Sequence, residues 1–271
     1  MNFHSDEWIM GRLREHYDEA CTIVPEDRIV GIWYQGSGNY SMDYEDSDVD
    51  TKCIVLPSIR QLCNDQPMSM THVRANDEHI DFKDVRLMFE IFKKQNLNFI
   101  EILFTKYYII NPAYEDLWNA VAARRDEIVC MNQASLLKSM KGIAGEKYHA
   151  MEHRYPSRIE WVDKYGADPK QLHHLLRIKD FMSRWTAGEA FADCFVPHNL
   201  EWLVEVKKGL YYLEDARRIG KEAMDDIQKM YDKYLEVYSH ETNMALWNFL
   251  EDVSYEMIRS GIAKEIGGIN G

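Results

Sequence analysis

The sequence predicts an α+β protein, with a small N-terminal α/β unit at residues 1–112 followed by a mainly α-helical domain at residues 113–271. Short apolar runs that alternate with polar residues, the pattern of half-buried strands, occur only before Pro112. After this proline the apolar residues recur at helical spacing. The chain is 46% hydrophobic and 12% aromatic, which is enough for a substantial core and is not typical of a disordered protein.

The N-terminal unit is expected to begin with an amphipathic helix at residues 6–20, because Ile9, Leu13 and Tyr17 stand at helical spacing there. Three strands follow: RIVGIWYQ at 28–35, VDTKCIVLP at 49–57 and HIDFKDV at 79–85. Gly36–Gly38 forms the turn after the first strand. The last strand runs directly into a strongly amphipathic helical pattern at residues 85–104.

The second unit is expected to consist of helices separated by proline and glycine residues. Helical patterns lie at about 115–130, 133–152, 168–187, 198–207, 211–237 and 240–262. The breaks come at Pro156, Gly166, Pro197 and Gly209.

Charge and cysteine content limit the classes of function. The formal net charge of −13 disfavours a general duplex DNA binder, because such binding depends on Lys and Arg neutralising phosphates. A small nucleotide or a single RNA end stays compatible with it. The five dispersed cysteines form no C-x-x-C pair and indicate reduced thiols. Without an apolar run of eighteen residues or a secretory signal, we expect a cytoplasmic protein that does not enter the membrane.

An unusual concentration of negative charge lies between the first two expected strands. Five acidic residues occupy eight positions: Asp43, Glu45, Asp46, Asp48 and Asp50. Asp48 and Asp50 are two apart on a strand and therefore point to the same side, where a divalent cation such as Mg²⁺ relieves their repulsion. The other three are interpreted as solvated loop charge.

Two further features accompany this aspartate pair. The Gly36–Ser37 turn offers backbone N–H groups and a hydroxyl, which suit a phosphate anion. Asp81 on the third strand is a third carboxylate arriving from a neighbouring strand. An anion-binding turn beside a carboxylate cluster is typical of metal-assisted phosphoryl transfer. A calcium loop of the EF-hand type is not favoured, because the sixth and twelfth positions counted from Asp46 hold Thr and Pro.

The motif GS at 36–37, ten intervening residues, DVD at 48–50 and IDF at 80–82 together resemble the DNA polymerase β-like nucleotidyltransferase superfamily. The resemblance implies a small mixed sheet with flanking helices. It also implies that Asp48, Asp50 and Asp81 bind two Mg²⁺ or Mn²⁺ ions that hold a nucleoside triphosphate. Gly36 and Ser37 would lie at its phosphates.

Two longer segments look like one branch of that superfamily, the predicted nucleotidyltransferases of bacteria and phages that are linked with RNA repair. These segments are residues 79–110, with Asn96 and Glu101 at the branch's positions, and residues 167–191. The second carries Lys170, His174 and Arg177 at i, i+4 and i+7, on one helical face. The resemblance implies that this face contacts triphosphate or RNA phosphate. From the residues alone, an ordinary solvated face with a packed histidine is the alternative.

The sequence departs from the superfamily pattern at several positions. Gln35 precedes the Gly-Ser turn where an apolar residue is usual, and Thr51 follows the second aspartate in place of an apolar residue. Gly38 and Asn39 stand where many members carry a basic residue. Asp84 is an alternative third carboxylate; we prefer Asp81, because Asp84 suits equally the N-cap of the following helix.

The resemblance implies an enzyme that moves a nucleoside monophosphate from a nucleoside triphosphate to an acceptor hydroxyl and releases pyrophosphate. An RNA end is the favoured acceptor, while a small-molecule hydroxyl and a protein side chain stay open. One alternative is a nucleotide- or RNA-binding module of the same fold without turnover. Another is an interaction protein whose helical half docks a protein partner.

Overall fold

The computed structural model describes residues 3–45 and 47–269 and divides into two compact units. The first unit comprises residues 1–39, 43–132 and 241–271, and the second comprises residues 40–42 and 133–240. The division that we predicted near residue 112 therefore differs from the division into compact units. The pattern of apolar residues shows that a segment is helical, but not which of two units it packs in.

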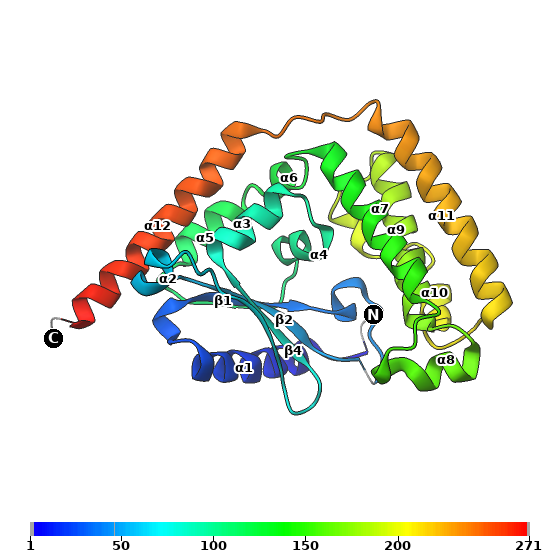
Figure 1. Ribbon diagram of the computed structural model, residues 1–271, viewed down its shortest axis with the longest axis horizontal. Helices are drawn as coiled ribbons and strands as arrows, with labels where there is room; N and C mark the ends of the chain where they lie inside the picture. The colour runs from blue at the N-terminus through cyan, green and yellow to red at the C-terminus, as the bar shows by residue number, and fades with distance from the viewer. Residues whose placement is uncertain (1–2, 46, 270–271) are drawn as a thin grey trace. The chain divides into compact units, whose positions relative to one another are not determined.

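Within its described residues, the first unit contains a five-stranded mixed sheet with the strand order β3-β4-β2-β1-β5 (Figure 1). The strands are β1 (Ile29–Gln35), β2 (Asp50–Val55), β3 (Ser69–Val73), β4 (His79–Asp84) and β5 (Tyr108–Ile110). β1 pairs antiparallel with both β2 and β5, and β3 pairs antiparallel with β4. β2 and β4 run parallel, so the second and third expected strands lie side by side.

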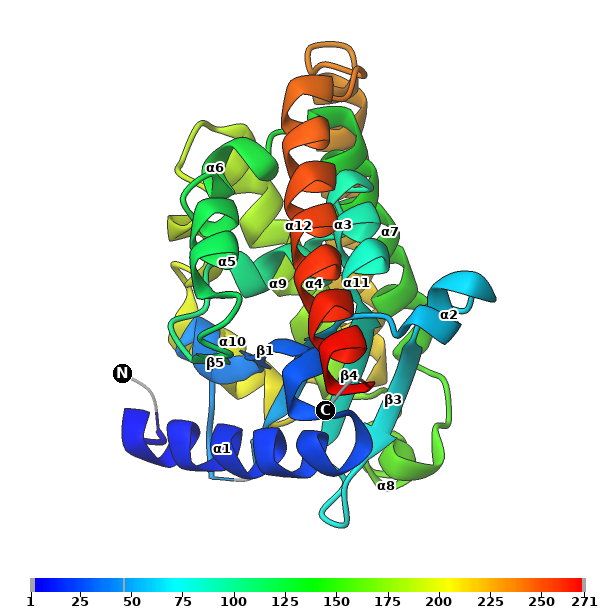
Figure 2. The same ribbon diagram turned by 90° about the vertical axis from the view of Figure 1, so that its left-hand side faces the viewer.

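Helix α1 (Asp6–Ile23) covers one face of this sheet (Figure 2). It begins at the N-cap Ser5, whose side chain accepts a hydrogen bond from the Trp8 N–H. Its apolar stripe, which includes Leu13, packs on Cys53 and Phe82 of the sheet. Full burial of a leucine of this kind contributes about 1.5–3 kcal/mol.

Helices α3 (Val85–Lys93), α5 (Glu115–Ala122) and α12 (Met244–Ile269) lie on the opposite face of the sheet. α12 contacts both α3 and α5. A Cβ atom on Gly261 of α12 would lie 2.7 Å from Leu56, so a residue without a side chain permits the close approach there. The last helix of the chain is therefore part of the first unit's core.

The second unit is helical throughout its described residues outside the connecting loops. Its helices are α7 (Gln133–Ala150), α8 (Ile159–Tyr165), α9 (Pro169–Thr186), α10 (Leu200–Lys207) and α11 (Leu213–Leu235). α9 contacts α7, α10 and α11 and is the central helix. Asp168 caps α9 by accepting a hydrogen bond from the Lys170 N–H, and Pro169 occupies its first turn.

The predicted strands are present within a few residues and the predicted helical segments are helical, although α12 ends at Ile269 rather than at 262, and several short elements were not predicted. β3 is exposed at four of its five positions and shows no apolar alternation, and β5 has only three residues. The short helices α2 (Ile59–Cys63) and α8 were also not predicted. Two predicted helices are interrupted: residues 85–104 form α3, α4 (Leu97–Ile100) and a 3-10 turn, and residues 115–130 form α5 and α6 (Arg125–Ile128).

Gln95 causes the first of these interruptions. Its backbone adopts a φ of 57°, which ends α3, and its buried side-chain amide donates to the carbonyl oxygens of Phe92 and Ile128. A hydrogen-bond partner 33 residues away cannot be read from local periodicity.

All five cysteines are free thiols; Cys53 and Cys194 are buried, whereas Cys63 and Cys130 are exposed. Over the described part of the chain, no helix combines the length and the apolar character that crossing a bilayer requires.

Candidate active site

The parallel pairing of β2 and β4 places two of the predicted carboxylates on one face of the sheet. Lys52 is in register with Asp81, and Cys53 is in register with Phe82. Because Cys53 and Phe82 face α1, alternation directs Asp50, Lys52 and Asp81 to the other face. Asp50 and Asp81 therefore lie on adjacent strands and on the same side.

Asp50 forms a pair with His79, a residue that the sequence analysis did not single out. The Asp50 Oδ1 atom accepts hydrogen bonds from the His79 backbone N–H and from its Nδ1, both at 3.0 Å. Both side chains are about half exposed, with 41% of Asp50 and 44% of His79 accessible. A carboxylate that accepts from Nδ1 fixes the ring orientation and leaves Nε2 as the outward-facing nitrogen. Strand alternation could have identified His79 as a site residue, because it lies two residues before Asp81 on the same strand and so on the same face.

Asp81 is held by two lysines. Its Oδ2 atom lies 3.2 Å from the Lys52 Nζ, and its Oδ1 atom lies 3.2 Å from the Lys83 Nζ and 3.4 Å from the Thr71 hydroxyl. The Lys52 ammonium also lies 3.7 Å from the centre of the Phe99 ring. Burial lowers the pKa of Lys52, while the neighbouring Asp81 opposes this shift. Both oxygens of the predicted third carboxylate therefore already accept bonds from cations.

The Gly-Ser turn wraps around the Tyr34 side chain. A Cβ atom at Gly36 would lie 2.6 Å from the Tyr34 hydroxyl, and one at Gly38 would lie 2.9 Å from it. The same hydroxyl accepts a hydrogen bond from the Gly38 N–H at 3.1 Å. Glycine is therefore required for this close approach, and the Gly38 N–H is occupied by Tyr34.

Ser37 connects this turn to the aspartate motif. Its hydroxyl donates to the Ser47 hydroxyl at 3.2 Å, and Ser47 immediately precedes Asp48. Ser47 also accepts a hydrogen bond from the Tyr44 N–H, which holds the intervening loop in place. The structure thus brings together two parts of the motif that are ten residues apart in the sequence.

Gln35, the residue that departs from the superfamily pattern before the turn, also has a structural role. It is in register with Asp50, and its side-chain amide donates to the Asn98 carbonyl oxygen at 2.9 Å. This hydrogen bond connects the end of β1 to helix α4, and an apolar residue at position 35 could not form it.

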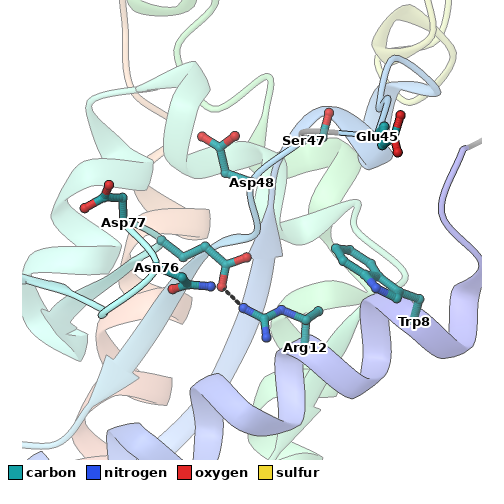
Figure 3. Close-up of a pocket in the computed structure, with 8 residues that line it drawn as sticks. Trp8, Arg12, Glu45, Ser47, Asp48, Asn76 and Asp77 are labelled. Carbon is teal, nitrogen blue, oxygen red and sulfur yellow. Dashed lines mark hydrogen bonds and ion pairs between the residues drawn. The ribbon is translucent and has the colours of Figure 1, made fainter. Parts of the chain in front are cut away.

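An open pocket of about 560 Å³ adjoins the aspartate motif (Figure 3). Its walls come from α1, from the loop before β2 and from the turn between β3 and β4. The residues that line it are Trp8, Arg12, Glu45, Ser47, Asp48, Asn76, Asp77 and Glu78. Asp48 is exposed on one wall, and the Trp8 indole and the Arg12 guanidinium lie across from it on α1 (Figure 3). Predicted site residues Ser37 and Asp48 thus lie at this pocket or one contact away from it.

Beneath the motif lies a buried ionic network centred on Glu78, which the sequence analysis missed. The Glu78 Oε1 atom accepts a hydrogen bond from the backbone N–H of Val49, the residue between the two aspartates, at 3.2 Å. Its Oε2 atom accepts from Arg74 and from His16, both at 2.9 Å, and also from Arg12. Glu78 therefore ties the aspartate motif to α1 and to the β3–β4 turn.

The network lowers the pKa of Glu78 to about 2. Burial by itself would raise it, but hydrogen bonds from His16, Asn76 and Arg12 outweigh the burial. The sequence signal was that Glu78 lies two residues before the apolar Ile80 and so on the same side, towards α1, where Arg12 and His16 stand one helical turn apart.

The cationic face on α9 differs from a solvated surface. Arg177 is buried, and its guanidinium lies 4.0 Å from the centre of the Tyr40 ring. Burial, with contributions from His173 and Arg177, holds the pKa of His174 well below its ordinary value. Lys170 is partly exposed at the first turn of the helix. Of the three, only Arg177 is buried in the second unit, while His174 and Lys170 are partly exposed.

Two further acidic residues of the N-terminal unit, Asp84 and Asp43, are buried and accept hydrogen bonds. Asp84 is fully buried as the N-cap of α3, where it accepts hydrogen bonds from the backbone and side chain of Arg86. The interpretation of Asp43 as solvated loop charge is wrong, because it is buried and accepts the N–H groups of Phe3 and His4. Asp46 lies outside the described residues.

Asp48 and Asp50 offer the oxygen ligands that Mg²⁺ prefers, and both are accessible. The prediction that both lie on one strand is wrong, because β2 begins at Asp50 and Asp48 lies in the loop before it. Asp81 fits a metal less well in this arrangement, because its oxygens are bonded to Lys52 and Lys83. Across residues 3–45 and 47–269, no group of three His, Cys, Asp or Glu side chains is positioned to hold a metal ion.

In comparisons with known proteins, no protein-family model and no curated protein matches the chain.

Proposed function

We propose that the protein is a nucleotidyltransferase that transfers a nucleoside monophosphate from a nucleoside triphosphate to an acceptor hydroxyl, with an RNA end as the favoured acceptor. The observation that carries the proposal is the position of Asp50 and Asp81 on one face of adjacent parallel strands. The Ser37–Ser47 contact supports it, since it joins the Gly-Ser turn to the residue before Asp48.

In this proposal Asp48 and Asp50 hold the divalent ion, which when bound neutralises charge on the triphosphate. The Ser37 hydroxyl, which donates to Ser47 in this structure, would give up that bond and donate its hydrogen to a phosphate oxygen. The acceptor oxygen forms a bond to the α-phosphorus, the bond from that phosphorus to the β-bridging oxygen breaks, and pyrophosphate leaves. The hydroxyl proton is lost to water or to a neighbouring base.

Asp81 has a modified role in the proposal. Because one oxygen accepts a hydrogen bond from Lys52 and the other forms an ion pair with Lys83, it fixes the positions of both lysines on the same face as Asp50. Two ordered ammonium groups next to the metal ligands suit the negative charge of a triphosphate.

One observation favours a second candidate, a nucleotide-binding module of the same fold without turnover. Asp81 is paired with lysines rather than open to a second metal ion, and the two-metal reaction requires ligands for both ions. Such a module would bind a triphosphate in a magnesium-dependent manner and release no pyrophosphate.

Incubation of the protein with each of the four α-³²P-labelled nucleoside triphosphates and Mg²⁺ or Mn²⁺ tests the proposal. The acceptors are pools of RNA, protein and small hydroxyl compounds, and Asp48→Asn is the control. We expect the label on RNA and stoichiometric pyrophosphate, both absent with the control. Tight triphosphate binding without pyrophosphate at any metal concentration supports the binding module, and equal labelling by Asp48→Asn rules out the metal assignment.

A further inference from the structure

A three-residue segment of the loop between β1 and β2 belongs to the second, helical unit. Tyr40–Met42 clusters with residues 133–240, whereas the residues on both sides of it cluster with the first unit. The segment begins three residues after Ser37 and ends six residues before Asp48. Both ends of the motif are therefore covalently continuous with a segment whose packing is supplied by the helical unit.

Two buried cations hold this segment, which we name the strap. The Arg177 guanidinium of α9 lies 4.0 Å from the centre of the Tyr40 ring, and that ring stacks on Phe195 at 6.0 Å and 21°. The Lys207 Nζ atom of α10 donates to the Met42 carbonyl oxygen at 3.3 Å. Only 6% of Arg177 and 8% of Lys207 is exposed.

The backbone of the strap is strained at its centre. Ser41 has a φ of 57°, in the left-handed region that non-glycine residues seldom adopt. Such a conformation persists only where the surrounding contacts fix it, and here the residues on both sides, Tyr40 and Met42, are the ones held by α9 and α10.

These contacts give Arg177 a different role from a phosphate ligand. A guanidinium packed on an aromatic ring and removed from water is positioned to fix that ring, because the cation–π attraction strengthens when the pair is desolvated. We propose that Arg177 and Lys207 are positioning residues, which act through the strap to fix the loop that carries Ser37 and Asp48. The catalytic consequence rests on the proposed function, whereas the ordering of the loop does not.

Hydrogen–deuterium exchange of the 271-residue chain without nucleotide tests the ordering. Tyr40→Ala removes the ring that Arg177 contacts, and Tyr40→Phe is the matched control that keeps it. We expect Tyr40→Ala and Arg177→Met each to speed exchange of the amides at residues 43–45, 47 and 48 by about tenfold relative to Tyr40→Phe. Exchange at these amides that is equal in Tyr40→Ala and Tyr40→Phe overturns the proposal. Where Arg177→Met does not fold, Tyr40→Ala alone decides.

Steady-state kinetics separates the two roles of Arg177. If it acts through the strap, Tyr40→Ala and Arg177→Met lower kcat by a similar factor and leave the KM for the triphosphate within about twofold, and the double variant is no worse than either single one. If Arg177 binds phosphate, its removal raises that KM by about tenfold or more while Tyr40→Ala does not, which overturns the proposal. A wild-type protein without transferase activity contradicts the proposed function, and the exchange experiment still decides the strap.

Discussion

At the scale of single residues, the site combines exposed carboxylates with buried groups that hold them. Asp48 is exposed, whereas Val49 beside it is buried and its N–H is bonded to Glu78. An exposed residue can be replaced with little effect on stability, while its buried partner cannot. Replacement of the exposed carboxylates is therefore expected to change activity, and replacement of the buried groups is expected to change stability.

Replacement of Asp48 by Asn should remove activity and leave the fold intact. The amide keeps the size of the side chain and removes the charge that a divalent ion requires, so we expect kcat/KM to fall by about 10³-fold or more. The thermal midpoint should change by less than about 2 °C, since the side chain is exposed. Calorimetry checks the second value, and a drop in both together would show that Asp48 is needed for folding.

The Asp81→Asn variant distinguishes a metal ligand from a residue that orients lysines. Because Lys52 and Lys83 bond both oxygens of Asp81, we expect the KM for the triphosphate to rise by about tenfold, with the Mg²⁺ concentration for half-maximal activity unchanged. Titration of activity against Mg²⁺ and against nucleotide measures the two separately. A rise in the Mg²⁺ requirement instead would return Asp81 to the role of metal ligand.

The ionic network at Glu78 makes stability depend on pH in the acidic range. The folded-state pKa of Glu78, about 2, is below its ordinary value of 4.5, so its contribution is fully present above about pH 4.5 and is lost as the pH falls towards 2. The contribution is at most about 3 kcal/mol. Urea unfolding between pH 6 and pH 3 should show this loss, and Glu78→Gln should be less stable at pH 6 and flatter with pH. An equal slope in that variant would assign the loss to other carboxylates.

At the scale of elements, the turn after β1 depends on glycines that admit the Tyr34 ring. Gly36→Ala places a Cβ within 2.6 Å of that side chain and should destabilise the protein by about 1–3 kcal/mol. Gly142→Ala is the matched control, because no atom lies within 4 Å of its added Cβ in the interior of α7. It should stabilise the protein by about 0.5–1 kcal/mol. Equal effects in chemical unfolding would contradict the role of Gly36.

Local periodicity was sufficient for the elements that frame the site, and it was not sufficient for their pairing. α1, β1, β2 and β4 follow from alternation and helical spacing, and these place Asp50 and Asp81 on strands. The contact of Asp81 with Lys52 depends on the register between β2 and β4, which no short stretch of sequence specifies. Glu78 was missed for the same reason, since its partners Arg12 and His16 lie more than sixty residues away.

At the scale of the whole molecule, the chain returns to its first unit at the end. Residues 241–271 join that unit, where α12 packs on α3 and α5. Lys93 of α3 lies 4.0 Å from the centre of the Trp247 ring of α12. The strands of the first unit thus lie more than a hundred residues before the helix α12 that covers its core. We therefore expect the first unit to fold only when this helix is present.

Removal of α12 should therefore unfold the first unit and spare the second. In a chain that ends at residue 240, the surfaces of α3 and α5 lose their cover, and their amides should exchange with solvent at rates near those of an unfolded chain, while the amides of α9 stay protected. A chain that ends at residue 265 is the control, because it keeps most of α12 and the bond from the Ile59 N–H to Glu265. Hydrogen exchange resolved by helix measures both. Loss of protection in α9 instead of α3 would show that the last helix stabilises the helical domain, as a boundary near residue 112 implies.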